Sequence, residues 1–297
     1  MDAYTGEMAA LGTALCWSFG SCCFTISSKR IGHNYVNQLR LTFALILLTG
    51  AHFFIYGRLT PANLTGHHWF WLGISGFVGF VIGDRMLFKS FVLIGPRLGM
   101  LLMATVPIFG TIIAWLSLNE ALEIKEIIAI TVTLSGVSWV ILERKYNNTH
   151  AEGNYGLGIL CGIGAAFCQA LGLILSKKGL GNDFPALSGN IIRVVVSVII
   201  MWTIPFFGEK ASVTIKKLAD KKATLALLGG SFFGPFAGVW LSLVAVKYAY
   251  IGIASTLMAL PPIILIPLSY IIFKEKITWG AVIGTVVAIG GVALIFL

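Results

Sequence analysis

The most regular feature of this chain is a succession of long apolar stretches separated by short polar connections. Each stretch holds about 20 residues, which is the length of helix that crosses the hydrocarbon core of a bilayer. The stretches lie near residues 8–28, 36–57, 69–91, 98–118, 126–142, 156–176, 186–207, 224–246, 252–273 and 279–297. Backbone polar groups in hydrocarbon must be satisfied within the segment, and the alternating pattern of a membrane β-barrel is missing. The sequence therefore predicts an all-α integral membrane protein with ten transmembrane helices.

Composition agrees with this prediction and excludes an ordinary soluble domain. Hydrophobic residues make up 57% of the chain and charged residues only 11%, whereas about a quarter of a soluble domain is charged. The 21 Lys and Arg residues against 12 Asp and Glu residues give a net charge of +9. In a membrane protein such an excess reflects basic loops that face anionic lipid or the cytoplasm. We expect membrane lipid as a partner and no nucleic acid.

The sequence offers no cofactor or metal site. All five cysteines lie inside apolar runs without a CxxC spacing or a neighbouring histidine cluster, so they indicate small hydrophobic side chains. The glycine-rich segments lie within apolar spans and are not followed by Lys-Ser or Lys-Thr, so ATP hydrolysis has no support. The five histidines lie mostly at span ends, and no catalytic cluster is visible at membrane depth. We therefore expect a protein that is not an enzyme.

An internal repeat divides the chain into halves at residues 1–150 and 151–297. Asn37-Gln38-Leu39-Arg40 in the second span resembles Asn190-Ile191-Ile192-Arg193 in the seventh. With five spans in each half, the second copy must be inverted relative to the first, as in many secondary transporters, with a substrate site near the midplane between the halves. Glycines recur in the third span (Gly79, Gly83) and in the eighth (Gly230, Gly234, Gly238), where they would let helix backbones approach closely.

Short motifs in both halves carry a family resemblance. In the first half they are Trp17-Ser18-Phe19-Gly20-Ser21, Gly83-Asp84, Leu101-Leu102-Met103 leading to Pro107, and the segment from Trp115 to Glu120. In the second half they are Gly252, Leu257-Met258, Pro262, Lys274-Glu275 and Gly290-Gly291-Val292. In this order they resemble the EamA family of the drug/metabolite transporter superfamily over essentially the whole chain. The family usually has Gly-Glu at the ends of the fourth and ninth spans, where this chain has Asn119-Glu120 and Lys274-Glu275.

Asp84 is the sharpest candidate for chemistry, because an ionisable group inside a bilayer is costly. It could carry a coupled proton or bind a substrate amine. The alternative is a structural ion pair with Arg85, Lys89 or Arg40. Adjacent residues of a helix point about 100° apart, which disfavours the pair with Arg85.

The intramembrane arginines Arg40, Arg85 and Arg193 allow two interpretations. Arg40 and Arg193 lie about one turn inside their spans, close enough to an interface for their side chains to snorkel toward it. If they face inward, a guanidinium could instead clamp a substrate carboxylate with two hydrogen bonds.

Other residues are candidates for lining the cavity or for moving the helices. Ser21 and Gln169 correspond through the repeat, and with Trp17 and Trp240 they could shape a substrate cavity; an interhelical hydrogen bond is the alternative for the polar pair. Pro107, Pro261 and Pro262 interrupt helices and could line a cavity, permit gating movements or merely bend the spans.

Together these patterns and the family resemblance imply a secondary transporter that moves a small organic metabolite or drug-like compound by alternating access. The coupling ion that the sequence suggests is a proton. A facilitative channel is the closest alternative, followed by a membrane-embedded enzyme or scaffold. The expected location is the plasma or inner membrane of the cell, crossed many times. Most Lys and Arg residues fall in loops after odd-numbered spans, which would place both termini outside, whereas the family suggests cytoplasmic termini.

Overall fold

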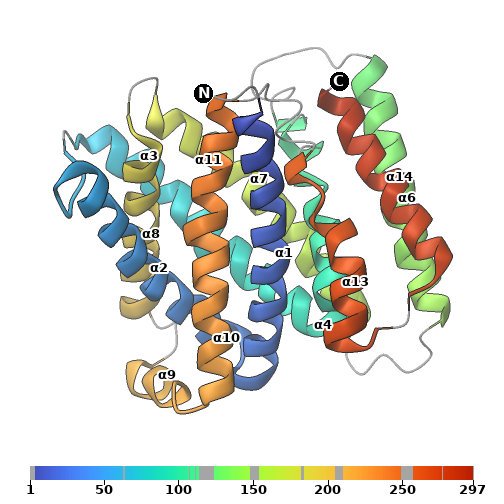
Figure 1. Cartoon of the computed structure of the whole chain (residues 1–297), viewed down its shortest axis with the longest axis horizontal. Coiled ribbons are helices and arrows are strands. Elements are labelled where there is room, and N and C mark those ends of the chain that lie inside the picture. Colours follow the sequence, from blue (N-terminus) through green and yellow to red (C-terminus); the bar gives the residue numbers. More distant parts are fainter. Residues whose placement is uncertain are drawn as a thin grey trace.

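The computed structural model is a bundle of helices (Figure 1). It describes residues 4–62, 64–106, 108–110, 112–113, 124–147, 154–181, 184–204, 210–248, 257–275 and 277–296, and no strand occurs among them. The helices of the first half are α1 (Thr5–Ile31), α2 (His33–Tyr56), α3 (Gly66–Gly76), the π-helix η1 (Phe77–Gly83), α4 (Asp84–Met103) and α6 (Ile124–Asn147). Those of the second half are α7 (Tyr155–Leu180), α8 (Ala186–Thr203), α9 (Ala211–Lys217), α10 (Lys221–Ser231), the π-helix η2 (Phe232–Gly238), α11 (Val239–Tyr248), α13 (Pro261–Phe273) and α14 (Trp279–Phe296).

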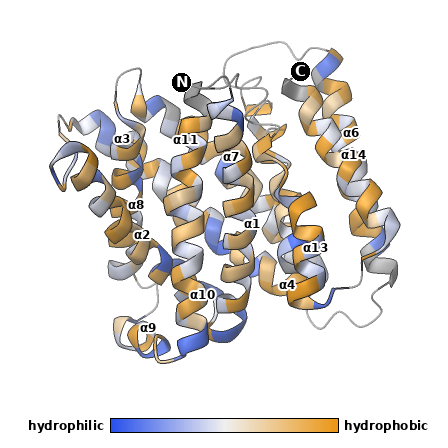
Figure 2. Cartoon of the chain, in the orientation of Figure 1, coloured by the Kyte–Doolittle hydropathy of each residue, from blue (hydrophilic) through white to orange (hydrophobic). Residues whose placement is uncertain are grey.

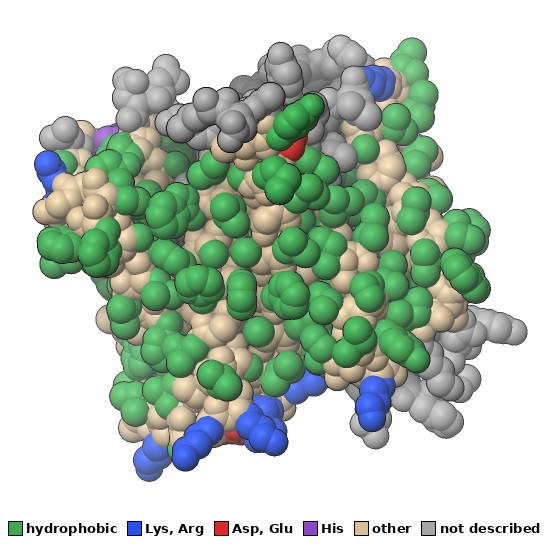
Figure 3. Space-filling model, in the orientation of Figure 1, with side chains coloured by type: hydrophobic (Ala, Val, Ile, Leu, Met, Phe, Trp, Pro, Cys, Tyr) green, Lys and Arg blue, Asp and Glu red, His purple; other side chains and the backbone are tan. Residues whose placement is uncertain are grey.

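The lengths and surface of these helices confirm an integral membrane protein. Five helical segments are long and apolar enough to cross a bilayer: Thr5–Ile31, His33–Tyr56, Tyr155–Leu180, Ala186–Thr203 and Lys221–Ser242. Three shorter apolar helices span Ile127–Glu143, Pro261–Phe273 and Trp279–Leu294. Hydrophobic residues predominate along the helices (Figure 2), and apolar side chains cover the face of the bundle seen in Figure 3. In water such a surface would aggregate. The total of ten spans stays a prediction.

The third and eighth spans are not simple α-helices. In each of them an α-helix passes into a seven-residue π-helix and then into a second α-helix. The two π-helices have related sequences, FVGFVIG in η1 and FFGPFAG in η2. Apolar periodicity does not predict these π-helices, because it cannot distinguish a hydrogen bond to the fifth preceding residue from one to the fourth. The third span then runs on into the fourth within α4, with a break at Gly95, whose φ is 81°.

Each π-helix packs against the first helix of the other half. Helix α1 crosses η2, and a methyl group added at Gly20 would lie 3.3 Å from the backbone nitrogen of Gly234. Helix α7 crosses η1, and a methyl group at Gly172 would lie 3.4 Å from the Cα atom of Gly79. The hydroxyl of Ser75 also donates to the Gly172 carbonyl across 2.6 Å. The expected role of the glycines in close helix packing is confirmed.

Helices α6 and α14, which end the two halves, form a tight pair at one edge of the molecule (Figure 1). Glycines lie where their backbones meet. A methyl group at Gly136 would collide with the backbone of Ala288, and one at Gly291 would collide with Thr133. The two halves therefore meet at this edge as well as at the two π-helices.

Basic side chains gather at the end of the bundle opposite the termini (Figure 3). There Asp220 accepts a hydrogen bond from the Ala223 backbone N–H (3.0 Å) and caps α10, and the Nε atom of Arg30 lies 2.9 Å from its carboxylate. The Ala223 hydrogen bond and the Arg30 guanidinium lower the pKa of Asp220. This acid therefore ties the start of α10 to the end of α1.

Helix α13 ends at Phe273, and the next residue, Lys274, adopts the left-handed conformation with φ 53° and ψ 33°. Glycine is the residue that usually occupies such a position, because a Cβ atom makes it strained. Lys274 stands where the resemblance would place a glycine, so the chain keeps the backbone turn without the residue that favours it. The next residue, Glu275, lies 3.8 Å from Nε of Arg97 on α4.

Candidate functional site

A buried ion pair lies between α2 and α4. Arg40 donates through Nη2 to the carboxylate of Asp84, the first residue after η1. Their exposed fractions are 5% and 6%. Of the partners expected for Asp84, Arg40 is therefore the one that forms the ion pair. The ion pair with Arg40, which was the structural alternative for Asp84, is therefore present in the structure.

Other groups also contact the Arg40 guanidinium. Its Nε donates to Oδ1 of Asn37 across 3.1 Å, and Nδ2 of Asn37 donates to the Phe80 carbonyl across 2.9 Å. Three aromatic rings surround the guanidinium, with centroid distances of 4.8 Å to Phe88, 5.4 Å to Phe24 and 6.0 Å to Phe80. Cation–π contacts of this kind help to offset the desolvation of a buried cation. Arg40 faces the interior and does not snorkel.

The second half also reaches Asp84. Gln169 on α7 donates through Nε2 to Oδ1 of Asp84 across 2.9 Å and approaches the Gly79 carbonyl at 3.4 Å. That carbonyl lies in η1 and already accepts the backbone N–H of Asp84. The π-helix thus places its carbonyls where side chains from α2 and α7 can bond them. Gln169 and Asp84, both predicted from sequence, come together here.

Arg193 on α8 lies near Asp84 and Gln169, but the contacts of its guanidinium differ from those of Arg40. Its guanidinium carbon is 4.4 Å from the centroid of the Phe80 ring, and Nη2 would lie 3.4 Å from a methyl group at Gly79. Asp84 is close enough to interact with it electrostatically. Within the described chain no hydrogen bond holds this guanidinium, and its Nε is buried without a partner. We call Arg40, Asp84, Gln169 and Arg193 the charged cluster.

Other predicted site residues lie outside the charged cluster. Trp17 packs against Gly238, at the end of η2. The hydroxyl of Ser21 donates to the Ser18 carbonyl of its own helix at 2.8 Å. Trp240 is 39% exposed and packs on Phe236, with ring centroids 5.9 Å apart. Within the described residues, neither of these tryptophans nor the serine forms a hydrogen bond with Asp84.

The structure describes two of the three prolines that were predicted to interrupt helices. Pro261 and Pro262 form the first turn of α13, where the missing N–H of proline is tolerated. The α-helical hydrogen bonding is interrupted just before them, where the Leu260 N–H donates to the Leu257 carbonyl across 3.2 Å, although φ and ψ of Leu260 stay in the right-handed α region. Pro107 lies outside the described residues.

Asn37 and Asn190 were not singled out as site residues, although the repeat that contains them was visible. Each lies three residues before an arginine, which places the two side chains on the same face of a helix. Asn37 is fully bonded, whereas both amide atoms of Asn190 are buried without a partner in the described chain. The signal that could have found them is the spacing Asn-x-x-Arg in both halves.

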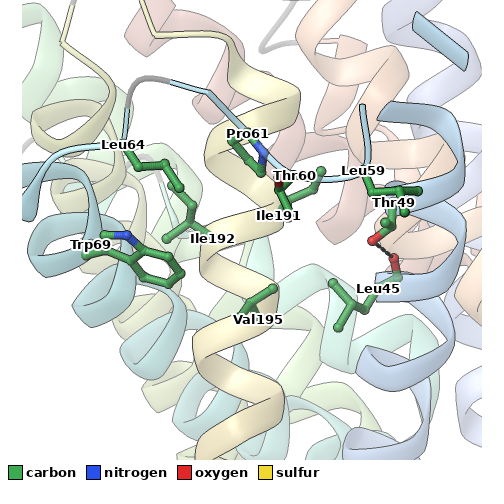
Figure 4. A pocket seen from close by; sticks show the side chains of 10 residues that line it. All are labelled: Leu45, Thr49, Leu59, Thr60, Pro61, Leu64, Trp69, Ile191, Ile192 and Val195. Carbon is green, nitrogen blue, oxygen red and sulfur yellow. Dashed lines mark hydrogen bonds between the residues drawn. The ribbon is translucent and has the colours of Figure 1, made fainter. Parts of the chain in front are cut away.

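An apolar cavity of about 280 Å³ lies apart from these charges (Figure 4). It is lined by Leu45, Thr49, Leu59, Thr60, Pro61, Leu64, Trp69, Ile191, Ile192 and Val195. Most of these side chains are aliphatic, and the Thr49 hydroxyl is already bonded to the Leu45 carbonyl at 2.7 Å. No charged side chain of the described residues lines this cavity. Among the described residues no group of His, Cys, Asp or Glu could hold a metal ion.

Apolar helices around a buried ion pair of the first half, contacted by Gln169 of the second half, are typical of an integral membrane protein of the transporter class. The sequence matches the EamA-like transporter family over residues 4–142 and 156–297. The chain belongs to this family, and the resemblance found from its motifs is confirmed. The family is one of transporters, and its two-repeat architecture fits the chain.

Comparison with solved structures shows the same fold in a distant protein. One crystal structure superposes with a TM-score of 0.59 at 14% sequence identity, covering 97% of this chain and 95% of that one. At this identity the likeness concerns the fold alone. No curated protein matches the sequence significantly.

Proposed function

We propose that the protein is a secondary transporter for a small organic metabolite, with its binding site at the charged cluster. The observation that carries this proposal is that Asp84, from the first half, is bound by Arg40 of its own half and by Gln169 of the second. Ionisable groups are rare and costly inside a bilayer, and they often mark substrate or ion pathways. A site contributed by both halves is the arrangement that a carrier with a central site requires.

We further propose that residues 1–150 and 151–297 form two inverted five-helix repeats that alternate access to this site. Two features support the proposal: the matching π-helices, and the reciprocal packing of α1 on η2 and of α7 on η1. Rocking of one half against the other would act at these crossings. Glycines let the backbones approach closely there, and the rings of Phe24 and Trp17 on α1 lie against Gly234 and Gly238 of η2. The break before Pro261 gives the ninth span a point at which to bend.

A gradient of substrate or of protons would drive transport. Asp84 is the candidate proton carrier, because it is the acid of the charged cluster and releasing it from Arg40 would change its charge state. Trp17 and Ser21 lie on α1 near the η2 crossing, where they would face the substrate path during rocking. Trp240 lies further out on α11. We place the protein in the plasma or inner membrane of the cell.

Counterflow in proteoliposomes tests this function against the channel alternative. Purified protein is reconstituted with a high internal concentration of an unlabelled amino acid, nucleoside, amine or carboxylate, and uptake of the labelled compound is followed. A carrier gives a transient accumulation that saturates with concentration. Flux that rises linearly without counterflow would support a channel instead. Protein-free liposomes are the control for leakage.

A further inference from the structure

The charged cluster holds more positive than negative charge. Two guanidinium groups, Arg40 and Arg193, face one carboxylate, Asp84. No other acidic side chain in the described chain interacts with either arginine inside the bundle. The cluster therefore carries one uncompensated positive charge at membrane depth, where an isolated charge is costly.

The surplus charge belongs to Arg193. Arg40 has a carboxylate, an amide oxygen and three aromatic rings around it. Arg193 has the face of one ring, Phe80, and no hydrogen bond to any described residue. A guanidinium has five N–H donors, so Arg193 retains its full capacity to bind an acceptor.

The repeat shows what Arg193 lacks. In the first half, Asn37, Arg40 and the acid that follows η1 form a closed set. In the second half, Asn190 and Arg193 occupy the corresponding positions on α8, and the residue that follows η2 is Val239. Asn190 is only 4% exposed, yet both of its amide atoms have no partner in the described chain. A buried amide without hydrogen bonds is uncommon and calls for a missing partner.

We infer that the substrate supplies this missing anion: it is a singly charged carboxylate, held by the Arg193 guanidinium with the Asn190 amide beside it. This inference rests on the proposed transport function. A carboxylate accepts two parallel hydrogen bonds from a guanidinium, and one negative charge brings the cluster to neutrality. A phosphate, with about −1.5 to −2 charges at pH 7, would overshoot. An amine would be repelled by Arg193 and would have to displace Arg40 from Asp84.

The first experiment uses no substrate and compares the thermal stability of purified variants in detergent. Arg193→Gln removes a cation that has no hydrogen bond, so stability should be unchanged or higher. Arg40→Gln leaves the Asp84 carboxylate and the Asn37 amide oxygen without the guanidinium that binds them, so stability should fall. If Arg193 were only a structural anchor, both variants would lose stability to a similar degree, which would overturn the inference.

The second experiment measures binding and transport with defined probes. Benzoate, benzamide, benzylamine and inorganic phosphate are titrated against the purified protein at constant ionic strength, and lactate and lactamide are compared in counterflow. Carboxylates should stabilise the native protein and exchange, while the neutral amides, the amine and phosphate should do neither. Arg193→Gln should weaken carboxylate binding at least about tenfold, and Arg193→Lys, which keeps the charge but loses the two-pronged contact, should be intermediate.

The control variant is Arg58→Gln, the same change at an exposed loop arginine, which should bind carboxylates like the native protein. The outcomes separate the two proposals. Counterflow of neutral or cationic solutes alone would overturn the carboxylate site and leave the transporter standing. Carboxylate binding that depends on Arg193, without counterflow of any solute, would refute transport and leave the anion site. An absence of any carboxylate effect, or equal effects in Arg193→Gln, overturns the inference.

Discussion

Replacing Asp84 with asparagine should destabilise the protein more than its change in size suggests. Asparagine has nearly the same shape, and its oxygen can still accept the Gln169 hydrogen bond. The amide cannot compensate Arg40, however, so the charge of the cluster rises from +1 to +2, with both guanidinium groups left without a carboxylate. Removing one partner of a buried ion pair typically costs about 3–5 kcal/mol. Because Asp84 and Arg40 are almost fully buried, we expect a loss in this range.

A double-mutant cycle isolates the pair from other effects of the substitution. The variants are Asp84→Asn, Arg40→Gln and their combination, compared by thermal unfolding in one detergent. The double variant returns the cluster to a net charge of +1, so it should lose less than the sum of the single variants. Coupling between contacting residues is about 0.5–3 kcal/mol, and a direct buried pair should lie at the upper end.

Additive effects within about 0.5 kcal/mol would refute the reasoning, because they would show that the two groups do not stabilise one another. Counterflow and pH-driven uptake are measured on the same variants. Exchange that persists while accumulation driven by a pH gradient is lost would identify Asp84 as the coupled proton carrier. Native stability with native uptake and pH dependence would remove Asp84 from both the fold and the mechanism.

Four further predictions concern other parts of the fold. Gly76→Ala should destabilise by about 1–3 kcal/mol, because its methyl group would collide with the backbone of α8, whereas Gly79→Ala makes only ordinary contacts; equal thermal stabilities would contradict this. Lys274→Gly should stabilise by about 1 kcal/mol by relieving the left-handed backbone, and a lower unfolding temperature would argue against strain there. Because the pKa of Asp220 is lowered in the folded protein, its carboxylate stabilises the fold above the ordinary pKa of aspartate, and this effect is lost as the pH falls through the pKa in the folded state. The native protein should therefore be more stable than Asp220→Asn at neutral pH, and the two should become equally stable in acid. A stability difference that does not change with pH would oppose this. A cysteine at the exposed position Ala219, at the basic end, should resist an impermeant thiol reagent added to intact cells, and labelling would place that end outside.

The sequence identified the groups of the charged cluster because charge inside an apolar span is unusual for a physical reason. Asp84, Arg40 and Arg193 were visible on that ground, and Gln169 through the repeat. The choice of Arg40 over Arg85 or Lys89 was not decided by sequence, since it depends on how α2 and α4 are rotated about their axes. That rotation follows from tertiary packing, which local spacing does not encode.

The tryptophans show a second limit. Trp17 and Trp240 are apolar residues within apolar spans, so composition says nothing about which helix face they occupy. The structure places Trp17 against Gly238 and leaves Trp240 at the surface. In a membrane protein both faces of a helix are apolar, so the contrast that locates a soluble core is missing. For that reason the prediction of the site depended mainly on polar and charged residues.

The π-helix η1 makes the charged cluster depend on how many residues the third span contains. A π-helix holds one more residue in its turn than the α-helix that would otherwise fill the space, and each α-helical residue advances the chain by about 100°. Deleting one residue between Phe77 and Gly83 would let this segment close into an α-helix without altering any residue of the cluster. The flanking helices would keep their relative orientation, because the α-helical turn fills the same space with one residue fewer. The carbonyls of Gly79 and Phe80 would then enter the regular α-helical hydrogen-bond pattern, and the bonds that Gln169 and Asn37 donate to them should weaken. A frame-preserving loss of one apolar codon in this span should thus loosen the cluster although each of its side chains is still present.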